Sequence, residues 1–463
     1  MKPLKDFKHK LITRRDFLAH GLIAFAGMAS LPSAFGMGLR KALEECGGGV
    51  DGPSLVPFMA FDMAGGASFP GNFLVGKKGG PEDLLKSYSL LGWNPHKSKA
   101  LNKDFGLPMA AGVSKILEGI LSNSSNEARK NFRMGSICHA APFDTTANKT
   151  NAATLALRAG FRGTYISNGV GVVSSPSGGN SSSVIDSVVL KPIFVMSIDD
   201  ILGSSSFGGS SLGNLKLPQL KTLAQSAIEI SRIQKNDYLD LPDGKVLGEL
   251  SKCAYEKSLD FLEGVAGLDP RTDPEVQAVY QIDQNTTPST ANAVAAALVM
   301  NTLKGQSGPA VWTLGDCDYH DGTQTTGDAK DLEMGVQIGR AIELAHRLKK
   351  PFFFQLLTDG GNENIEGTRM WSGDSEDKCM TVIGYYSPSG PPKMIRTQVG
   401  HFTEGQGADR NTLLGRDPSL VGYAVFANYL NICGKIDEFP THAPGIFTEA
   451  GQLKSVLIFE GKV

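Results

Sequence analysis

The sequence predicts an α/β protein: a three-layer sandwich with a mostly parallel central sheet and a helical insertion. The segment Pro309–Asn362 gives the main indication, because an apolar run, an amphipathic run from Asp328 to Leu348 and a second apolar run follow one another. This pattern is typical of a strand, a helix and a parallel strand. Composition agrees, since 41% of the 463 residues are hydrophobic and 20% are charged, which is ordinary for a globular enzyme.

Acidic residues and a histidine follow the two predicted strands of this segment. Asp316, Asp318 and His320 come after the first strand, and Asp359 comes directly after the second. Parallel strands connected by a helix end at the same edge of a sheet, where open α/β sheets bind ligands. We therefore expect these side chains to share one pocket, and two carboxylates facing an imidazole indicate a divalent metal.

Residues 1–36 have the features of a twin-arginine export signal. Arg14 and Arg15 precede Phe17 and a weakly apolar run that ends at Leu31, and small residues follow as far as Gly36. We expect cleavage after Gly36, the twin-arginine translocation machinery as a partner, and a periplasmic or secreted protein formed by residues 37–463. No later run is long and apolar enough to predict a membrane span.

Charge and cysteine content narrow the class further. The formal net charge is −2, and no basic patch beyond the amino terminus favours nucleic acid, so a small partner is expected. The six cysteines are free to pair in an oxidising compartment, and their spacing does not select a pairing. Cys317, inside the acidic cluster, is either a soft metal ligand or a residue that is buried or disulfide-bonded.

The first strand of the mature chain is predicted from Leu55 to Phe61. It delivers Asp62 to a loop that contains Gly65 and Gly66, which makes Asp62 a candidate metal ligand. This loop has neither the Walker spacing nor a Gly-x-Gly-x-x-Gly pattern, so no nucleotide is predicted.

A second strand is predicted from Phe132 to Cys138, and Asp144 and Thr145 lie between it and a helical segment. A hydroxyl at the amino end of a helix is favoured as an alkoxide by the helix dipole, which makes Thr145 a candidate nucleophile. Helix capping by either residue is the alternative reading. Arg158 or Arg162 is positioned to hold an anion, or lies on a solvated helix face.

Residues 168–305 are interpreted as an insertion, rich in Ser and Gly as far as residue 213 and then mostly helical. It shapes or covers the pocket, or binds a partner. After the second predicted strand of the central segment, the strand-like run Met394–Val399 leads to His401, and a last helix is predicted from Ser419 to Ile432.

The ordered set of Asp62, Asp144-Thr145, Asp316-x-x-x-His320, Asp359 and His401 resembles the alkaline phosphatase superfamily, which includes sulfatases and phosphodiesterases. More closely, the twin-arginine signal, the Gly-Gly loop and the run that begins at Asp318 resemble an uncharacterised branch of exported bacterial proteins. The resemblance covers about residues 55–450.

This resemblance implies one metal held by Asp316, His320 and His401, and a second held by Asp62, Asp359 and Thr145. Thr145 attacks a small anionic phosphate or sulfate ester, and Arg162 or Arg158 holds the anion. Two cations would lower the pKa of the attacking hydroxyl and stabilise charge on both reacting oxygens.

One position departs from the superfamily, because Gly360 stands where a histidine is expected after Asp359. The second site then has oxygen ligands only, which favours Mg²⁺, Mn²⁺ or Ca²⁺ over Zn²⁺, unless it is empty, and Asn362 or Glu363 is available to complete it. An exported metal-dependent hydrolase is the leading function. The alternatives are a non-catalytic protein that serves binding or envelope assembly, and a carbohydrate or adhesion module.

Overall fold

The computed structural model describes residues 55–93, 100–140, 152–161, 165–169, 192–202 and 265–461, with short gaps at 318, 320–323, 359, 366–367, 369 and 373–376. Two short strands and a few residues between 222 and 229 are also described. The chain divides into two compact units, residues 1–49 with 199–266 and residues 50–198 with 267–463. The main sheet and the candidate sites described below lie in the second unit.

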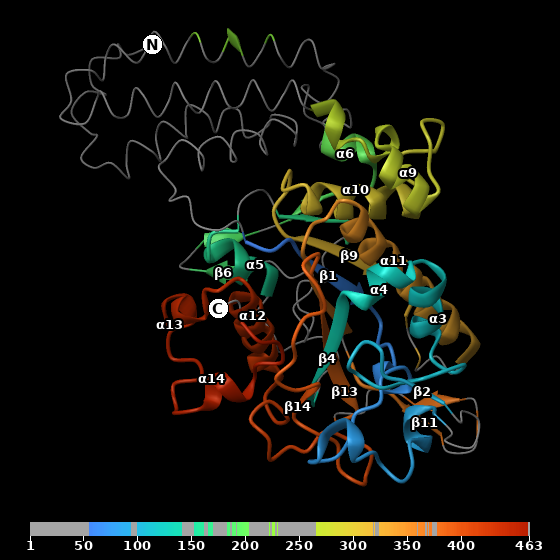
Figure 1. Ribbon diagram of the computed structural model, residues 1–463, viewed down its shortest axis with the longest axis vertical. Coiled ribbons are helices and arrows are strands. Elements are labelled where there is room, and N and C mark those ends of the chain that lie inside the picture. Colours follow the sequence, from blue (N-terminus) through green and yellow to red (C-terminus); the bar gives the residue numbers. More distant parts are fainter. Residues whose placement is uncertain are drawn as a thin grey trace, which may run out of the picture. The chain divides into compact units, whose positions relative to one another are not determined.

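An eight-stranded sheet with the order β14-β4-β13-β10-β1-β9-β5-β8 forms the centre of this unit (Figure 1). β13 runs antiparallel to both of its neighbours and every other pairing is parallel, so the predicted mixed α/β class with a mostly parallel sheet is confirmed. The strands are β1 (Phe58–Met63), β4 (Phe132–His139), β5 (Ile166–Ser167), β8 (Ile193–Phe194), β9 (Ala310–Leu314), β10 (Phe352–Thr358), β13 (Cys379–Tyr386) and β14 (Gln398–Val399).

The predicted strand, helix and strand are present as β9, α11 (Gln324–Arg347) and β10. β9 and β10 are parallel but they are not neighbours, because β1 lies between them and pairs with both. All six residues of β1 are buried. Apart from Asp62 these residues are apolar, and such a strand is stable where both of its faces are covered, as at the centre of a parallel sheet.

Helices cover both faces of the sheet. On one face, α5 (Ala152–Arg158) and α12 (Val421–Ile432) form an apolar cluster with Phe58 and Ala60 of β1. On the other face lie α10 (Ala291–Leu303) and α11, with α3 (Lys115–Ser122) packed along α11 (Figure 1). The backbones of α3 and α11 touch: a Cβ atom added at Gly119 would lie 2.5 Å from the nitrogen of Val336.

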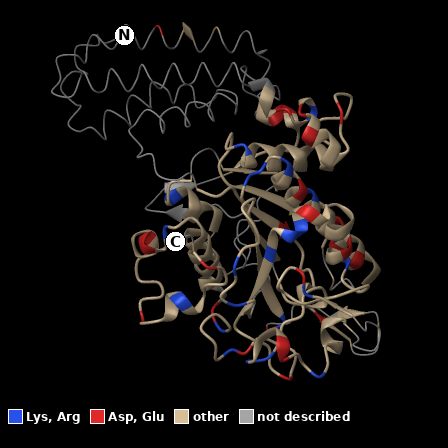
Figure 2. Cartoon of the chain, viewed as in Figure 1, with Lys and Arg blue, Asp and Glu red and all other residues tan. Residues whose placement is uncertain are grey.

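Shorter elements fill the connections. They are β2 (Leu101–Asn102), β3 (Met109–Ala110), β6 (Ser183–Ile185), β7 (Val188–Leu190), β11 (Glu363–Asn364), β12 (Trp371–Ser372), α4 (Asn126–Lys130), α6 (Ile198–Leu202), α9 (Pro274–Tyr280), α13 (Phe439–His442), α14 (Gln452–Ser455), η2 (Phe69–Gly71), η3 (Gly80–Glu82), η4 (Ser89–Leu91), η5 (Val265–Leu268), η6 (Pro270–Thr272), η7 (Pro418–Leu420) and η8 (Ile436–Glu438). Figure 2 shows acidic and basic residues interspersed along the described part of the chain.

The predicted signal, residues 1–36, lies outside the described part of the chain, so the boundaries 1–36 and 37–463 stay predictions. The same holds for the insertion. Of its residues 168–305, the described β8 belongs to the main sheet and α10 packs against β9, whereas 203–221 and 230–264 are not described. Among the described helices, none combines the length and the apolar character needed to cross a membrane.

Candidate functional site

Three adjacent parallel strands bring predicted ligands to one edge of the sheet. Asp62 lies near the end of β1, in register with Thr313 of β9 and Leu357 of β10. Asp316 follows β9 by two residues, and Asp359, which is outside the described residues, comes directly after β10. Neighbouring strands are about 4.8 Å apart, so the three strand ends lie within about 10 Å of one another.

The carboxylate of Asp62 is buried, with 3% of the residue exposed. It accepts a hydrogen bond from the Thr313 hydroxyl at 3.4 Å. The main chain of Thr313 is itself fixed by the Asn168 side chain, which accepts from its N–H at 2.6 Å and donates to its carbonyl at 3.0 Å. Burying a carboxylate is costly unless hydrogen bonds or a cation compensate it, so Asp62 suits a cation site.

The glycine turn after β1 is held by β10 and by the segment that follows it. Gly65 and Gly66 have φ values of 111° and 87°, which a side chain rarely allows. The Thr358 hydroxyl donates to the Met63 carbonyl at 2.9 Å and accepts from the Ala67 N–H at 2.8 Å. The turn is therefore fixed in place beside the end of β10.

Asn362 supplies a further oxygen at this edge. Its side-chain nitrogen donates to the Gly66 carbonyl, and the residue is fully buried. Its Oδ1 atom has no hydrogen-bond partner among the described residues. Burying an amide oxygen without a hydrogen-bond partner costs free energy. An amide oxygen is also a suitable ligand for Mg²⁺ or Ca²⁺. Of the two predicted alternatives, Glu363 instead forms an ion pair with Lys378 at 3.2 Å.

The segment after β9 runs back along the glycine turn. Asp316 is exposed and has a φ of 57°, and the N–H of Cys317 donates to the Ala64 carbonyl at 3.0 Å. The Cys317 thiol is buried, with 1% of the residue exposed, and it donates to the Leu314 carbonyl at 3.2 Å. Burial raises its pKa, so the prediction of a buried thiol is confirmed. His320 and Asp318 lie outside the described residues.

The other described cysteines are buried as well. Of the six, Cys138, Cys317, Cys379 and Cys433 are described, and each is buried and carries a free thiol. Cys46 and Cys253 fall outside the described part of the chain, so nothing further about pairing follows.

A buried polar network that sequence reasoning missed supports this segment. Asp331 of α11 accepts hydrogen bonds from the Tyr319 hydroxyl at 2.5 Å and from the Asn72 side chain at 2.7 Å. The Asn72 oxygen in turn accepts from the Ser114 hydroxyl and from the N–H of Ile116 at the start of α3. Burial raises the pKa of Asp331 to about 7, although the hydrogen bonds from Tyr319 and Asn72 oppose this shift.

A signal for Asp331 was present in the sequence. It precedes Met334 and Ile338 by three and seven residues, which places a carboxylate on the apolar face of an amphipathic helix. Tyr319 stands between Asp318 and His320 in the sequence. Its hydrogen bond to Asp331 therefore fixes the middle residue of the predicted metal motif.

His401 lies far from this edge. It follows β14, five strand positions from β9, which corresponds to about 24 Å in a flat sheet. Its Nε2 atom is 3.0 Å from a carboxylate oxygen of Asp409, and the Asp409 N–H donates to the His401 carbonyl. Strand order therefore places His401 apart from the strand end that carries Asp316. Because His320 lies outside the described residues, the first metal site of Asp316, His320 and His401 stays a prediction.

The predicted nucleophile and anion clamp, Thr145 and Arg162, lie outside the described residues. The segments before and after Thr145 are described. The N–H of Ala140 donates to the Gly415 carbonyl, and α5 packs on the face of β1 that carries Asp62. Arg158 is in the last turn of α5, about 9 Å along the helix from Ala152. Within the described residues no group of three or more His, Cys, Asp or Glu side chains is arranged for a metal, but His320 and Asp359 are not among them.

Comparison with known proteins does not establish a family. No family model matches the sequence, and no curated protein matches it. Two solved structures of the TAB5 alkaline phosphatase with magnesium bound, each with one histidine replaced by aspartate or glutamate, are 11% identical and cover 72% of this chain and 92% of their own. Their TM-scores are 0.22 and 0.23, which are too low to support an argument about fold or function.

Proposed function

We propose that this chain is an exported, metal-dependent hydrolase of phosphate or sulfate esters and a distant relative of the alkaline phosphatase superfamily. The observation that carries the proposal is the adjacency of β9, β1 and β10, whose ends bear Asp316, Asp62 and Asp359. The ordered sequence motifs that resemble the superfamily support it as well.

The proposed ligand set is Asp62, Asp316, His320 and Asp359, with the buried Asn362 oxygen in the position left open by Gly360. This set is mostly oxygen, which favours Mg²⁺, Mn²⁺ or Ca²⁺. When bound, the cation would lower the pKa of the attacking hydroxyl and stabilise charge on the ester oxygens. His401 is not included, because the position of β14 separates it from the other ligands.

The protein side chains have separate roles in this proposal. The Thr145 hydroxyl attacks phosphorus or sulfur and loses its proton, and the ester oxygen leaves with the alcohol, so that the transferred group is bound to Thr145 until water releases it. Arg162 pairs with the anionic oxygens of the substrate. Asp62, which accepts a hydrogen bond from Thr313, would be one of the residues that hold the cation.

The test is hydrolysis of an aryl phosphate, an aryl phosphodiester and an aryl sulfate, with Mg²⁺, Mn²⁺, Ca²⁺ and Zn²⁺ in turn. Thr145→Ala should abolish turnover and leave the thermal midpoint nearly unchanged. If Thr145 only caps a helix, the variant should instead lose about 1 kcal/mol of stability and keep its activity. Elemental analysis of the purified wild-type protein accompanies the assay.

A second function, non-catalytic binding in the cell envelope, is favoured by Gly360. This residue is buried, and its carbonyl accepts a hydrogen bond from the Cys379 thiol at 3.5 Å, so no ligand side chain follows Asp359 directly. Absence of turnover by the wild type with every cation, together with absence of bound metal, would favour this second function over the hydrolase.

Export is tested separately. Replacing both Arg14 and Arg15 with Lys should leave the precursor in the cytoplasm, because the receptor of the twin-arginine route reads this pair. Fractionation followed by immunoblotting measures the distribution. Unchanged export of the double variant would rule out this route.

A further inference from the structure

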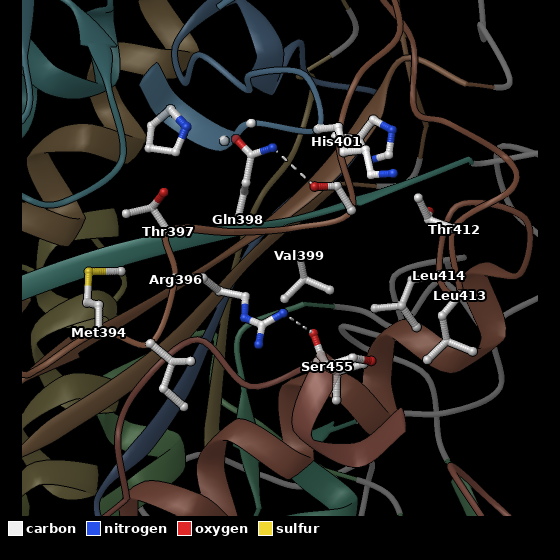
Figure 3. Close-up of a pocket in the computed structure, with 17 residues that line it drawn as sticks. Met394, Arg396, Thr397, Gln398, Val399, His401, Thr412, Leu413, Leu414 and Ser455 are labelled. Atoms are coloured by element: carbon white, nitrogen blue, oxygen red, sulfur yellow. Dashed lines mark hydrogen bonds between the residues drawn. The ribbon is translucent and has the colours of Figure 1, made fainter. Parts of the chain in front are cut away.

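A cavity of about 710 Å³ lies beside β14, away from the three aspartate-bearing strands. Its walls are the loop from Lys78 to Pro81, the segment Met394–His401, the loop from Thr412 to Leu414, and Ser455 with Val456 (Figure 3). This volume is in the range of small-molecule sites. Among the described residues, neither Asp62 nor Asp316 lines the cavity, so it is distinct from the part of the proposed hydrolase site that the structure describes.

The charge of the lining has one sign. Lys78 and Arg396 line the cavity, and none of the described residues that line it is Asp or Glu. Both cations are exposed to solvent, and neither forms an ion pair with a carboxylate in the described part of the chain. His401 also lines the cavity, but its Nε2 atom is paired with Asp409.

Arg396 is held in position without being neutralised. Its two terminal nitrogens donate to the main-chain carbonyls of Ser455 at 3.0 Å and Lys454 at 3.3 Å, and Figure 3 shows the first of these contacts. Carbonyl groups orient the guanidinium but leave its full charge in place, because they carry only partial charges. An anion entering the cavity therefore meets a fixed positive group.

The wall formed by the loop that carries Lys78 is also held in place before a ligand binds. The Gln398 side chain accepts from the Gly76 N–H at 3.0 Å and donates to the Gly76 carbonyl at 3.1 Å. These bonds fasten the loop that carries Lys78 to β14. Little ordering of this wall is needed when a ligand binds, which favours affinity.

Apolar side chains form the rest of the lining. Val399, Leu413 and Leu414 lie near Arg396 (Figure 3), and Ile395 remains 47% exposed at the surface of the cavity. One additional polar atom is available, since the buried Thr397 hydroxyl oxygen has no hydrogen-bond partner among the described residues.

We propose that this cavity binds a small organic anion, with one negatively charged head group on a compact apolar body. The charges of Arg396 and Lys78 attract the head group, and the aliphatic side chains cover the body. A carboxylate and a phosphate monoester share this chemistry, and the two are separated by the experiment.

The experiment is calorimetric titration of the full chain with octanoate, octyl phosphate and protonated octylamine below their micellar concentrations. Both anions, or one of them, should bind with a stoichiometry near one, and the cation should bind at least tenfold more weakly. The tighter of the two anions identifies the head group. Binding should weaken as salt is added, because the cations are exposed. Equal binding of octylamine, or no binding of either anion, overturns the proposal.

Variants locate the site. Arg396→Gln should weaken anion binding about tenfold and Lys78→Gln about threefold, whereas Lys130→Gln, an exposed cation on α4, should change nothing. Arg396→Lys keeps the charge and should retain most of the affinity; equal loss in Arg396→Lys and Arg396→Gln would show that the residue only caps α14 and would overturn the proposal.

Ile395→Glu provides a second test that does not depend on the contacts of Arg396. The position is exposed, so the variant should fold, and the added negative charge should abolish binding of the anions. Ile395→Gln is its neutral control and should bind within threefold of the wild type. Equal affinities in these two variants would contradict an anion site here.

Discussion

The centre and the margin of the same sheet differ in charge and in packing. At the centre, β9, β1 and β10 carry Asp316 and Asp62, and the segments that follow them are fastened to the glycine turn by hydrogen bonds. At the margin, β14 borders an open cavity lined by Lys78 and Arg396. About 19 Å separates β1 from β14. This difference is the basis of our two proposals, a cation site at the centre of the sheet and an anion site at its margin.

The strongest test of this comparison removes a central carboxylate. Asp62→Asn keeps the shape of the side chain but takes away the charge that a cation requires, so bound metal and any esterase activity should fall at least about 100-fold. Elemental analysis and the ester assay measure the two effects. Octanoate binding at the margin serves as the control and should be unchanged; a parallel loss of anion binding would mean that the two regions are not independent.

The buried carboxyl of Asp331 should make stability depend on pH. Because burial raises the pKa of Asp331 in the folded protein to about 7, above the ordinary value of 3.8, the folded state keeps the proton to higher pH. This contribution to stability is complete below about pH 4 and is lost as the pH rises through 7, with an upper bound of roughly 4 kcal/mol. Urea unfolding between pH 4 and pH 8 measures it.

Asp331→Asn is the matched variant, since an amide keeps an oxygen for Tyr319 and Asn72 but does not ionise. Its stability should change less with pH over this window, and it should exceed the wild type at pH 8. Identical pH profiles for the two proteins would show that Asp331 is not the titrating group.

The smallest effect is expected at the margin. Asp409→Asn removes the charge that faces His401 at 3.0 Å, and partly exposed pairs of this kind contribute about 0.2–1 kcal/mol. The pKa of Asp409 is lowered, first by the Asn411 N–H and also by His401, so this contribution is present at neutral pH and is lost as the pH falls below about 4. Thermal unfolding at pH 7 measures the loss, and metal content should not change. A loss of metal would show that His401, as the resemblance implies, and Asp409 contribute to the cation site.

Sequence reasoning located the long elements but not their order in the sheet. The apolar runs of β1, β4 and β10 and the periodicity of α11 and α12 are local signals, and the structure has these elements close to the predicted positions. Insertion of β1 between β9 and β10 depends on pairings over more than 240 residues, for which no local pattern exists.

The order of strands also decides where His401 lies. His401 was expected at the central edge because a strand precedes it. This strand, β14, has only two paired residues, and its sequence does not show that it pairs with β4. The contact between Tyr319, Asp331 and Asn72 joins three distant segments, so only a folded chain reveals it. Asp62 was identified correctly as a residue at a strand end because that property is local.

The central position of β1 has a consequence for biosynthesis. About 250 residues separate Met63 from Ala310, the first residue of β9, so at ~5–20 residues per second the ribosome needs roughly 10–50 s to supply the partners of β1 after β1 itself has emerged. During that interval β1, of whose six residues only Asp62 is charged, has no strand partner on the nascent chain. The predicted export signal emerges earlier still. If this signal directs the chain to a transporter that accepts folded cargo, export would have to wait until the carboxy-terminal half has been made.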